Sequence, residues 1–177
     1  WTNSSSMLAE AIHSTADCVN QRLLLLGMKE AKRPESADHP LGHHRVTYFW
    51  SMIVALLLFF MGGAFSVYEG IERLRHPHPL ENGLVALAVL GVAVVLEAFS
   101  LAGAMREIRK TAGGKPFLRW FRETRESELM VVAGEDIAAL AGLALAFCAV
   151  AAALATGNPL WDALGTLSVG VVLMVIA

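Results

Sequence analysis

Long apolar runs without charge constrain this chain more than any other feature. The run over residues 48–68, YFWSMIVALLLFFMGGAFSVY, has no charged side chain, and the run over residues 137–156 has none either. A helix crosses the hydrocarbon core of a bilayer with about 20 mostly apolar residues. Only helices and closed barrels satisfy all their own backbone groups there. Charged residues form 17% of the chain, below the roughly 25% typical of soluble domains. We therefore predict an all-α polytopic transmembrane helix bundle.

Polar, proline-containing segments divide the chain into helices. The separating segments are KRPESADHPLG, RHPHPLENG and TGNP, whose composition is typical of turns. No strand pattern competes with the helical one. The stretch KPFLRWFRETRES alternates bulky apolar and basic residues, which fits either an interfacial amphipathic helix or a solvated connector. The pattern predicts five helices, over residues 7–27, 47–74, 83–108, 129–156 and 159–177.

Basic residues predict the orientation. Of the 14 lysines and arginines, all but Arg73 and Arg75 lie in or beside two connections, the one after the first predicted helix and the one between the third and fourth. The positive-inside rule makes these two connections cytoplasmic. The first helix then runs from outside to inside, so we expect a further span before residue 1 and treat residues 1–177 as a fragment. The net charge of −2 gives no basic field for nucleic acid.

The predicted helix over residues 7–27 is the least apolar of the five, because it holds a polar stripe. On a helix, Glu10, His13, Asp17 and Asn20 fall within an arc of about 80°. His13 and Asp17 are one turn apart, close enough to hold one ion between them. Imidazole with carboxylate suits zinc. The alternative is a polar face hydrogen-bonded to other helices. Glu10 lies nearer the outer edge, as a candidate proton carrier or a group solvated at the interface.

Three further acidic residues of the predicted helices are candidates for the same site. Glu135 and Asp136 are adjacent and therefore about 100° apart on a helix, so only one of them can face the first helix squarely. We favour Asp136 as a metal ligand and Glu135 as an auxiliary ligand or proton carrier. An acidic helix start that favours the helix dipole is the alternative. Glu97, the one charge in residues 84–105, is a candidate ligand, proton site or hydrogen-bond partner.

The first basic connection contains a second cluster of metal-ligating residue types. In ADHPLGHHR, Asp38, His39 and His43 lie within a few residues of one another. This spacing fits a second metal site at the surface, and equally a loop whose histidines bind no metal. The histidines of RHPHP are interpreted as part of a proline-rich turn.

Several motifs in register resemble the cation diffusion facilitator family. They are SSSMLAEAIHSTADCVNQ, then DHPLGHHR before an aromatic span, and YEGIERL at the end of that span. EDIAALAG and GNPLWDALGTLSVGVVL are similar to the fifth and sixth helices of a branch that includes mitochondrial zinc transporters and bacterial relatives. The resemblance covers nearly the whole chain.

The resemblance implies a six-helix transmembrane domain, of which this chain carries helices two to six. It places the first helix and a cytoplasmic C-terminal metal-binding domain outside residues 1–177. It implies a homodimer in the lipid bilayer that exchanges protons for divalent cations. His13 and Asp17 match the ligands of the second helix, and Asp136 matches one of two from the fifth. Val132 stands where the other is expected, so Glu135, Glu97 or a water would complete the shell. Ser36 replaces an acid common in the loop motif.

We therefore expect a zinc/proton antiporter, without enzymatic activity or bound cofactor, that exports zinc from the cytoplasm by alternating access. His13 suits proton coupling, because protons and metal compete for an imidazole that titrates near neutral pH. The location would be a bacterial cytoplasmic membrane, or an organelle membrane in a eukaryote. A non-transporting membrane scaffold, suggested by Val132, is the alternative. An intramembrane metallohydrolase would require a motif such as H-E-x-x-H, which the sequence lacks.

Overall fold

A computed structural model describes residues 4–34, 42–43, 45–80, 82–114, 116–124 and 127–177. All regular elements in this part of the chain are helices, which confirms the predicted all-α class. The first predicted helix extends further in both directions than its apolar pattern suggested. The elements are α1 (Ser5–Ala31), α2 (Arg45–Leu57), the π-helical η1 (Leu58–Ala64), α3 (Phe65–Arg75), α4 (Gly83–Thr111), α5 (Phe117–Glu123), α6 (Ser127–Thr156) and α7 (Leu160–Ile176).

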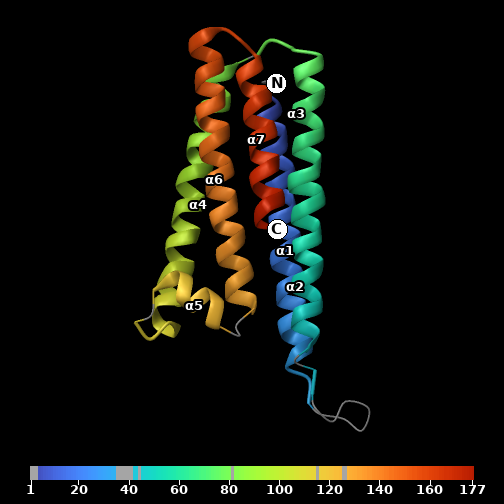
Figure 1. The fold of residues 1–177 in the computed structure, drawn as a ribbon, viewed down its shortest axis with the longest axis vertical. Coiled ribbons are helices and arrows are strands. Elements are labelled where there is room, and N and C mark those ends of the chain that lie inside the picture. Colours follow the sequence, from blue (N-terminus) through green and yellow to red (C-terminus); the bar gives the residue numbers. More distant parts are fainter. Residues whose placement is uncertain (1–3, 35–41, 44, 81, 115, 125–126) are drawn as a thin grey trace.

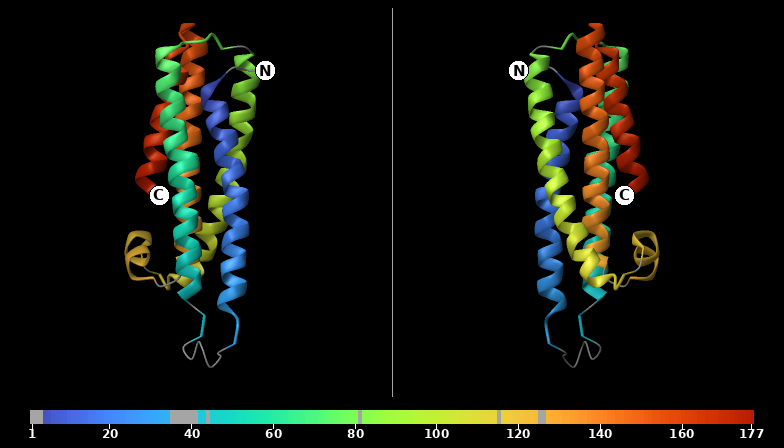
Figure 2. Two further views of the ribbon diagram at one scale, coloured as in Figure 1. Left: turned by 90° about the vertical axis from the view of Figure 1, so that its right-hand side faces the viewer. Right: turned by 90° about the vertical axis from the view of Figure 1, so that its left-hand side faces the viewer.

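The long helices lie side by side along one axis (Figures 1 and 2). α2, η1 and α3 follow one another without a break, so the predicted helix over residues 47–74 is one long rod with a π-helical centre. The start of α1, the end of α3 and the α6–α7 connection lie at one end of the bundle, and the end of α1, the start of α2 and α5 lie at the other (Figure 1). Both basic connections are thus on one side, as the predicted orientation requires.

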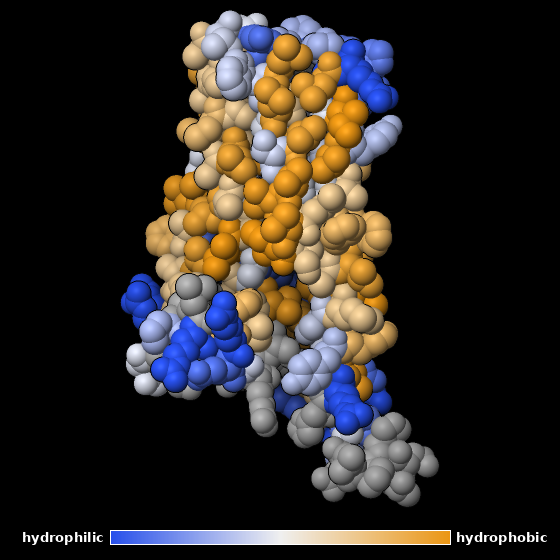
Figure 3. Space-filling model, viewed as in Figure 1, coloured by the Kyte–Doolittle hydropathy of each residue, from blue (hydrophilic) through white to orange (hydrophobic). Residues whose placement is uncertain are grey.

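Within the described ranges, three helices are long and apolar enough to cross a membrane. They cover Arg45–Arg75, Gly83–Thr111 and Leu129–Thr156, and α7 is a shorter apolar helix. Large apolar side chains such as Leu84 and Phe99 are 78% and 73% exposed. Figure 3 shows hydrophobic residues across the middle of one face and hydrophilic residues toward both ends. The chain is therefore an integral membrane domain, as predicted.

The core consists of small and branched apolar residues that let the helices approach closely. Its centre is formed by α4, α6 and α7 together with Leu58 of η1. The long rod and α7 touch almost backbone to backbone, since a Cβ on Gly170 would lie 2.8 Å from the Gly63 carbonyl oxygen. Small residues permit such contacts between membrane helices. These contacts fix the position of η1 along the axis of α7.

The stretch after α4 folds as the short helix α5, one of the two structures its sequence allowed. Trp120 is buried against Ile108, Ala112 and Ala133, which ties α5 to α4 and α6. Its exposed side carries arginines, among them Arg122. A position in the membrane interface stays a prediction.

Candidate cation site

The polar stripe of α1 lies against protein. The helix begins at the cap residue Ser4, whose hydroxyl accepts a hydrogen bond from the Met7 amide at 3.2 Å. Further along, His13 is 2% exposed and Asn20 is fully buried. The amide of Asn20 donates a hydrogen bond to Glu135 on α6 at 2.6 Å. The low hydropathy of α1 is thus accommodated inside the bundle, as a spanning helix with polar residues requires.

His13 and Asp17 lie together as their spacing predicted. The His13 Nε2 atom is 3.5 Å from the Asp17 Oδ2 atom. Both His13 ring nitrogens, Asp17 Oδ1 and Asn20 Oδ1 are buried without a hydrogen-bond partner among the described residues. Unpaired buried polar atoms are rare and cost about 1–3 kcal/mol each. Imidazole nitrogen and carboxylate oxygen are donor atoms that zinc accepts, so these residues fit a divalent cation as substrate.

The two adjacent acids of α6 face different neighbours. Glu135, besides accepting the Asn20 hydrogen bond, lies within hydrogen-bonding range of Asp17. Asp136 instead faces α4, where its Oδ2 atom accepts a hydrogen bond from Ser100 at 3.1 Å. The Asp136 carboxyl group is also within hydrogen-bonding range of Glu97. In this structure the acid in contact with α1 is therefore Glu135, whereas the sequence favoured Asp136. The part of Asp136 as a ligand stays a prediction.

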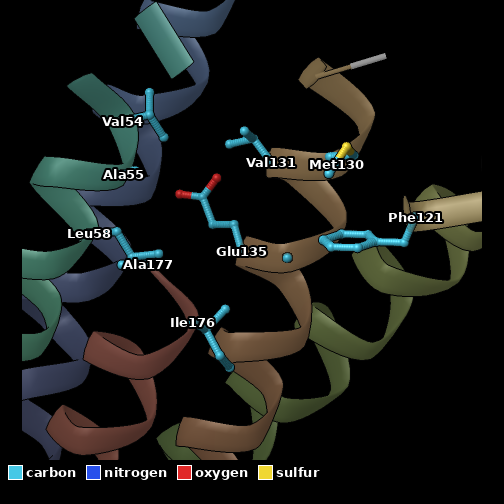
Figure 4. A pocket seen from close by; sticks show the side chains of 10 residues that line it. Val54, Ala55, Leu58, Phe121, Met130, Val131, Glu135, Ile176 and Ala177 are labelled. Atoms are coloured by element: carbon cyan, nitrogen blue, oxygen red, sulfur yellow. The ribbon is translucent and has the colours of Figure 1, made fainter. Parts of the chain in front are cut away.

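Two cavities lie beside these acids. Figure 4 shows the Glu135 carboxylate pointing into a cavity of about 210 Å³ whose other lining residues include Leu58, Met130 and Phe121. Its wall is otherwise apolar and reaches α5, at the end of the bundle with the basic connections. A second cavity, between α4 and α6, is lined by Ser100, Val132 and Asp136 among others. Val132 thus faces α4 together with Asp136.

The complete set of predicted ligands is not gathered around one point. Within the described ranges, no three His, Cys, Asp or Glu side chains converge closely enough to hold a metal ion. The structure brings together three pairs instead: His13 with Asp17, Asp17 with Glu135, and Glu97 with Asp136. A four-ligand shell would require these side chains of α1 and α6 to come closer together than they are here.

Glu10 lies near these pairs, within range of electrostatic interaction with Asp17 and Glu97. Glu10 is half-buried and accepts a hydrogen bond from Ser14 at 3.0 Å. In the first basic connection, His43 is partly exposed at the start of α2. Asp38 and His39 lie outside the described residues, so the second metal site stays a prediction. His76 is exposed, with Nε2 3.8 Å from the Glu72 carboxylate.

Sequence reasoning missed one more buried carboxylate, which contacts the start of α1. Asp162 of α7 accepts hydrogen bonds from the Ser5 amide at 2.8 Å and from the Ser4 and Ser5 hydroxyls at 3.0 Å each. The Ser6 amide also donates to it at 3.3 Å. A run of serines at a helix start signals capping. Nothing local could indicate that the partner is 157 residues away.

Comparison with known proteins identifies the family. Residues 1–177 match the cation efflux transmembrane domain. A Xenopus laevis protein named "Proton-coupled zinc antiporter SLC30A9, mitochondrial" is 41% identical over 175 residues, which is 98% of this chain and 31% of that protein. The human protein of the same name is 38% identical, over 98% of this chain and 31% of its own length. Arabidopsis thaliana Metal tolerance protein C4 is 34% identical over 100% of this chain and 39% of its own length.

This chain therefore belongs to the cation efflux family, which confirms the resemblance to cation diffusion facilitators. It spans about a third of the length of the curated relatives it matches. The description of the family as a cation efflux transmembrane domain agrees with the apolar helices of the structure.

Proposed function

We propose that this chain is the transmembrane transport domain of a zinc/proton antiporter that exports zinc from the cytoplasm. The observation that carries the proposal is the pair formed by buried His13 and half-buried Asp17 beside Glu135. The two ring nitrogens of His13 and the Oδ1 atom of Asp17 are buried atoms without a hydrogen-bond partner among the described residues. Relatives named as proton-coupled zinc antiporters support zinc as the cation and the proton as the counter-ion.

In this proposal α1 and α6 share the cation. His13 and Asp17 supply a nitrogen and an oxygen from α1, and Glu135, which already adjoins Asp17, supplies an oxygen from α6. Asp136 would complete the shell after a small rotation of α6, with Glu97 as an auxiliary carboxylate beside it. Val132 contributes no donor atom. These ligands give zinc the mixed nitrogen and oxygen shell that it accepts in proteins.

Proton exchange follows from the same pairs. Two carboxyl groups that face each other in a low-dielectric interior need a proton or a cation between them. Zinc arriving between Asp17 and Glu135 would displace that proton, because metal and proton compete for the same lone pairs. The apolar cavity beside Glu135 offers an approach from the end with the basic connections. Rocking of the helices about the site would then expose it to the other side.

The test is zinc-driven proton flux by the complete protein in proteoliposomes. His13→Ala and Asp17→Ala each remove a ligand and should reduce the flux at least about 100-fold. Glu72→Gln, an exposed carboxylate near the opposite end of the bundle, is the matched control and should leave it unchanged. Undiminished flux in both ligand variants would overturn the assignment.

A membrane scaffold without transport is the second candidate, because Val132 replaces a ligand and no three ligating side chains converge in the described part of the chain. Zinc titration separates the two proposals. Saturable zinc binding that weakens in His13→Ala and Asp136→Ala supports the antiporter. Zinc binding that is unchanged in both variants supports the scaffold.

We also propose that the protein is a homodimer in the lipid bilayer, as the family resemblance implies.

A further inference from the structure

The long rod formed by α2, η1 and α3 changes its winding beside the candidate site. Over Leu58–Ala64 the backbone is π-helical, the one such stretch among the described residues. π-helical turns are rare and occur frequently at functional sites. Gly62 and Gly63 lie within this stretch and are both buried. The irregular turn therefore places two residues without side chains inside the bundle.

Gly62 lies directly against the His13 ring. A Cβ atom on Gly62 would be 3.3 Å from His13 Nδ1 and 3.2 Å from Leu173 Cδ1. Ordinary van der Waals contacts of a Cβ begin at about 3.4 Å, so a methyl group here would displace one neighbour or both. The imidazole or Leu173 would have to shift by a few tenths of an ångström to make room for it.

The His13 ring is oriented by packing. Its Nε2 atom faces Asp17 at 3.5 Å, and its Nδ1 atom faces Gly62. In most metal-ligating histidines the second ring nitrogen donates a hydrogen bond that fixes the orientation of the ring. Neither nitrogen of His13 has such a partner in the described part of the chain. The edge of the ring that carries Nδ1 instead lies beside Gly62 of η1.

We propose that Gly62 is a positioning residue for cation transport. Held in place by the π-helical turn, it lets the Nδ1 edge of His13 rest on η1 and turns the Nε2 atom toward Asp17. The inference rests on the proposed function, because it takes Nε2 as the atom offered to the cation. An alanine at this position would push the ring away from η1 by a few tenths of an ångström and so misplace Nε2 relative to the cation that Asp17 holds.

The experiment compares two glycine-to-alanine variants of the complete protein. A Cβ on Gly142, a buried residue of α6, would lie 3.3 Å from Val169 Cγ1 on α7, an equally tight contact with an apolar partner. Zinc affinity by titration, the KM and kcat of zinc transport, and the Tm are measured for both. We expect Gly62→Ala to weaken zinc affinity and raise KM about 10-fold, with kcat within about twofold. Gly142→Ala should match the unaltered protein in affinity and KM.

Equal zinc affinity in Gly62→Ala and Gly142→Ala would overturn the inference. Gly62→Ala/Leu173→Val removes the Leu173 Cδ1 contact, and so keeps the test open if the single variant folds poorly. Weak zinc affinity that persists in this double variant supports the contact with His13, and full recovery overturns it. His13→Ala distinguishes a failure of the proposed function from a failure of the inference about Gly62. If His13→Ala binds zinc normally, the proposed function fails as well. If it loses affinity while Gly62→Ala does not, only the inference about Gly62 fails.

Discussion

Helix α1 carries two buried polar clusters that are built in opposite ways. The outer cluster consists of Ser4, Ser5, Ser6, Asp162 and Thr166, and both Asp162 oxygens accept hydrogen bonds there. The Ser5 and Ser6 hydroxyls also lie 2.9 and 3.1 Å from the Thr166 hydroxyl. The central cluster consists of His13, Asp17, Asn20 and Glu135, and four of its buried polar atoms have no partner among the described residues.

The two clusters differ in whether protein atoms alone satisfy their polar groups, and we infer that the outer cluster is structural and the central one binds a ligand. The outer cluster is complete with protein atoms alone, since a negative side chain at the start of a helix satisfies free amides and favours the helix dipole. The central cluster leaves donor and acceptor atoms unused in a setting where each costs free energy. A group that the fold leaves incomplete at such a cost is expected to bind something. The following predictions test this contrast, from the largest expected effect to the smallest.

Removing the outer carboxylate should cost the most stability. Asp162→Ala leaves the Ser5 and Ser6 amides without their acceptor, and we expect a loss of about 2–5 kcal/mol in the free energy of unfolding. Asp17→Ala, a truncation of the same residue type in the central cluster, should change it by less than about 1 kcal/mol. Asp17 Oδ1 has no partner to lose, Oδ2 makes only a 3.5 Å contact with His13 Nε2, and removing the carboxylate also removes its repulsion of Glu135. Denaturant unfolding in detergent measures both. Equal losses would erase the contrast between the clusters.

Zinc should stabilise the protein through the central cluster only. At a zinc concentration of about 100 times the Kd, binding to the folded state adds about 2.7 kcal/mol. Asp162→Asn should keep this increment, although its Tm without zinc is lower. His13→Ala should lose most of it. The measurement is the Tm with and without zinc, and an increment that survives in His13→Ala would place zinc elsewhere.

Truncating the Asn20 side chain should weaken zinc binding moderately. Asn20→Ala removes the amide that holds Glu135 at 2.6 Å, so Glu135 loses its fixed place beside Asp17. Residues that orient metal ligands typically change metal affinity 10- to 100-fold, and we expect about 10-fold here. Zinc titration provides the value. If Asn20→Ala binds zinc as tightly as the unaltered protein, Glu135 is not a zinc ligand that Asn20 holds in place.

The smallest effect should come from the α4 side. Ser100→Ala removes the hydrogen bond to Asp136, which in our account is not the acid in contact with α1. We expect the KM for zinc to change by no more than about threefold, in line with the loss of one partly exposed hydrogen bond. A change as large as that of Asn20→Ala would instead assign Asp136 the leading part, as the sequence favoured.

Sequence periodicity predicted the features that are set within a single helix. The shared face of His13, Asp17 and Asn20 follows from 3.6 residues per turn, and the five long helices follow from their apolar runs. The choice between Glu135 and Asp136 depends on how α6 is rotated against α1, which packing with α4 and α7 decides. The π-helical turn at Gly62 and the pairing of Asp162 with α1 are likewise properties of contacts between helices. No local pattern encodes them.

The central claim is that a cation completes the central cluster through the His13 ring. X-ray absorption at the zinc edge of the zinc-loaded complete protein tests it directly, with His13→Ala as the comparison. We predict that imidazole scattering in the unaltered protein decreases in His13→Ala and that oxygen ligands remain. Identical spectra and equal zinc content in the two proteins would contradict the account.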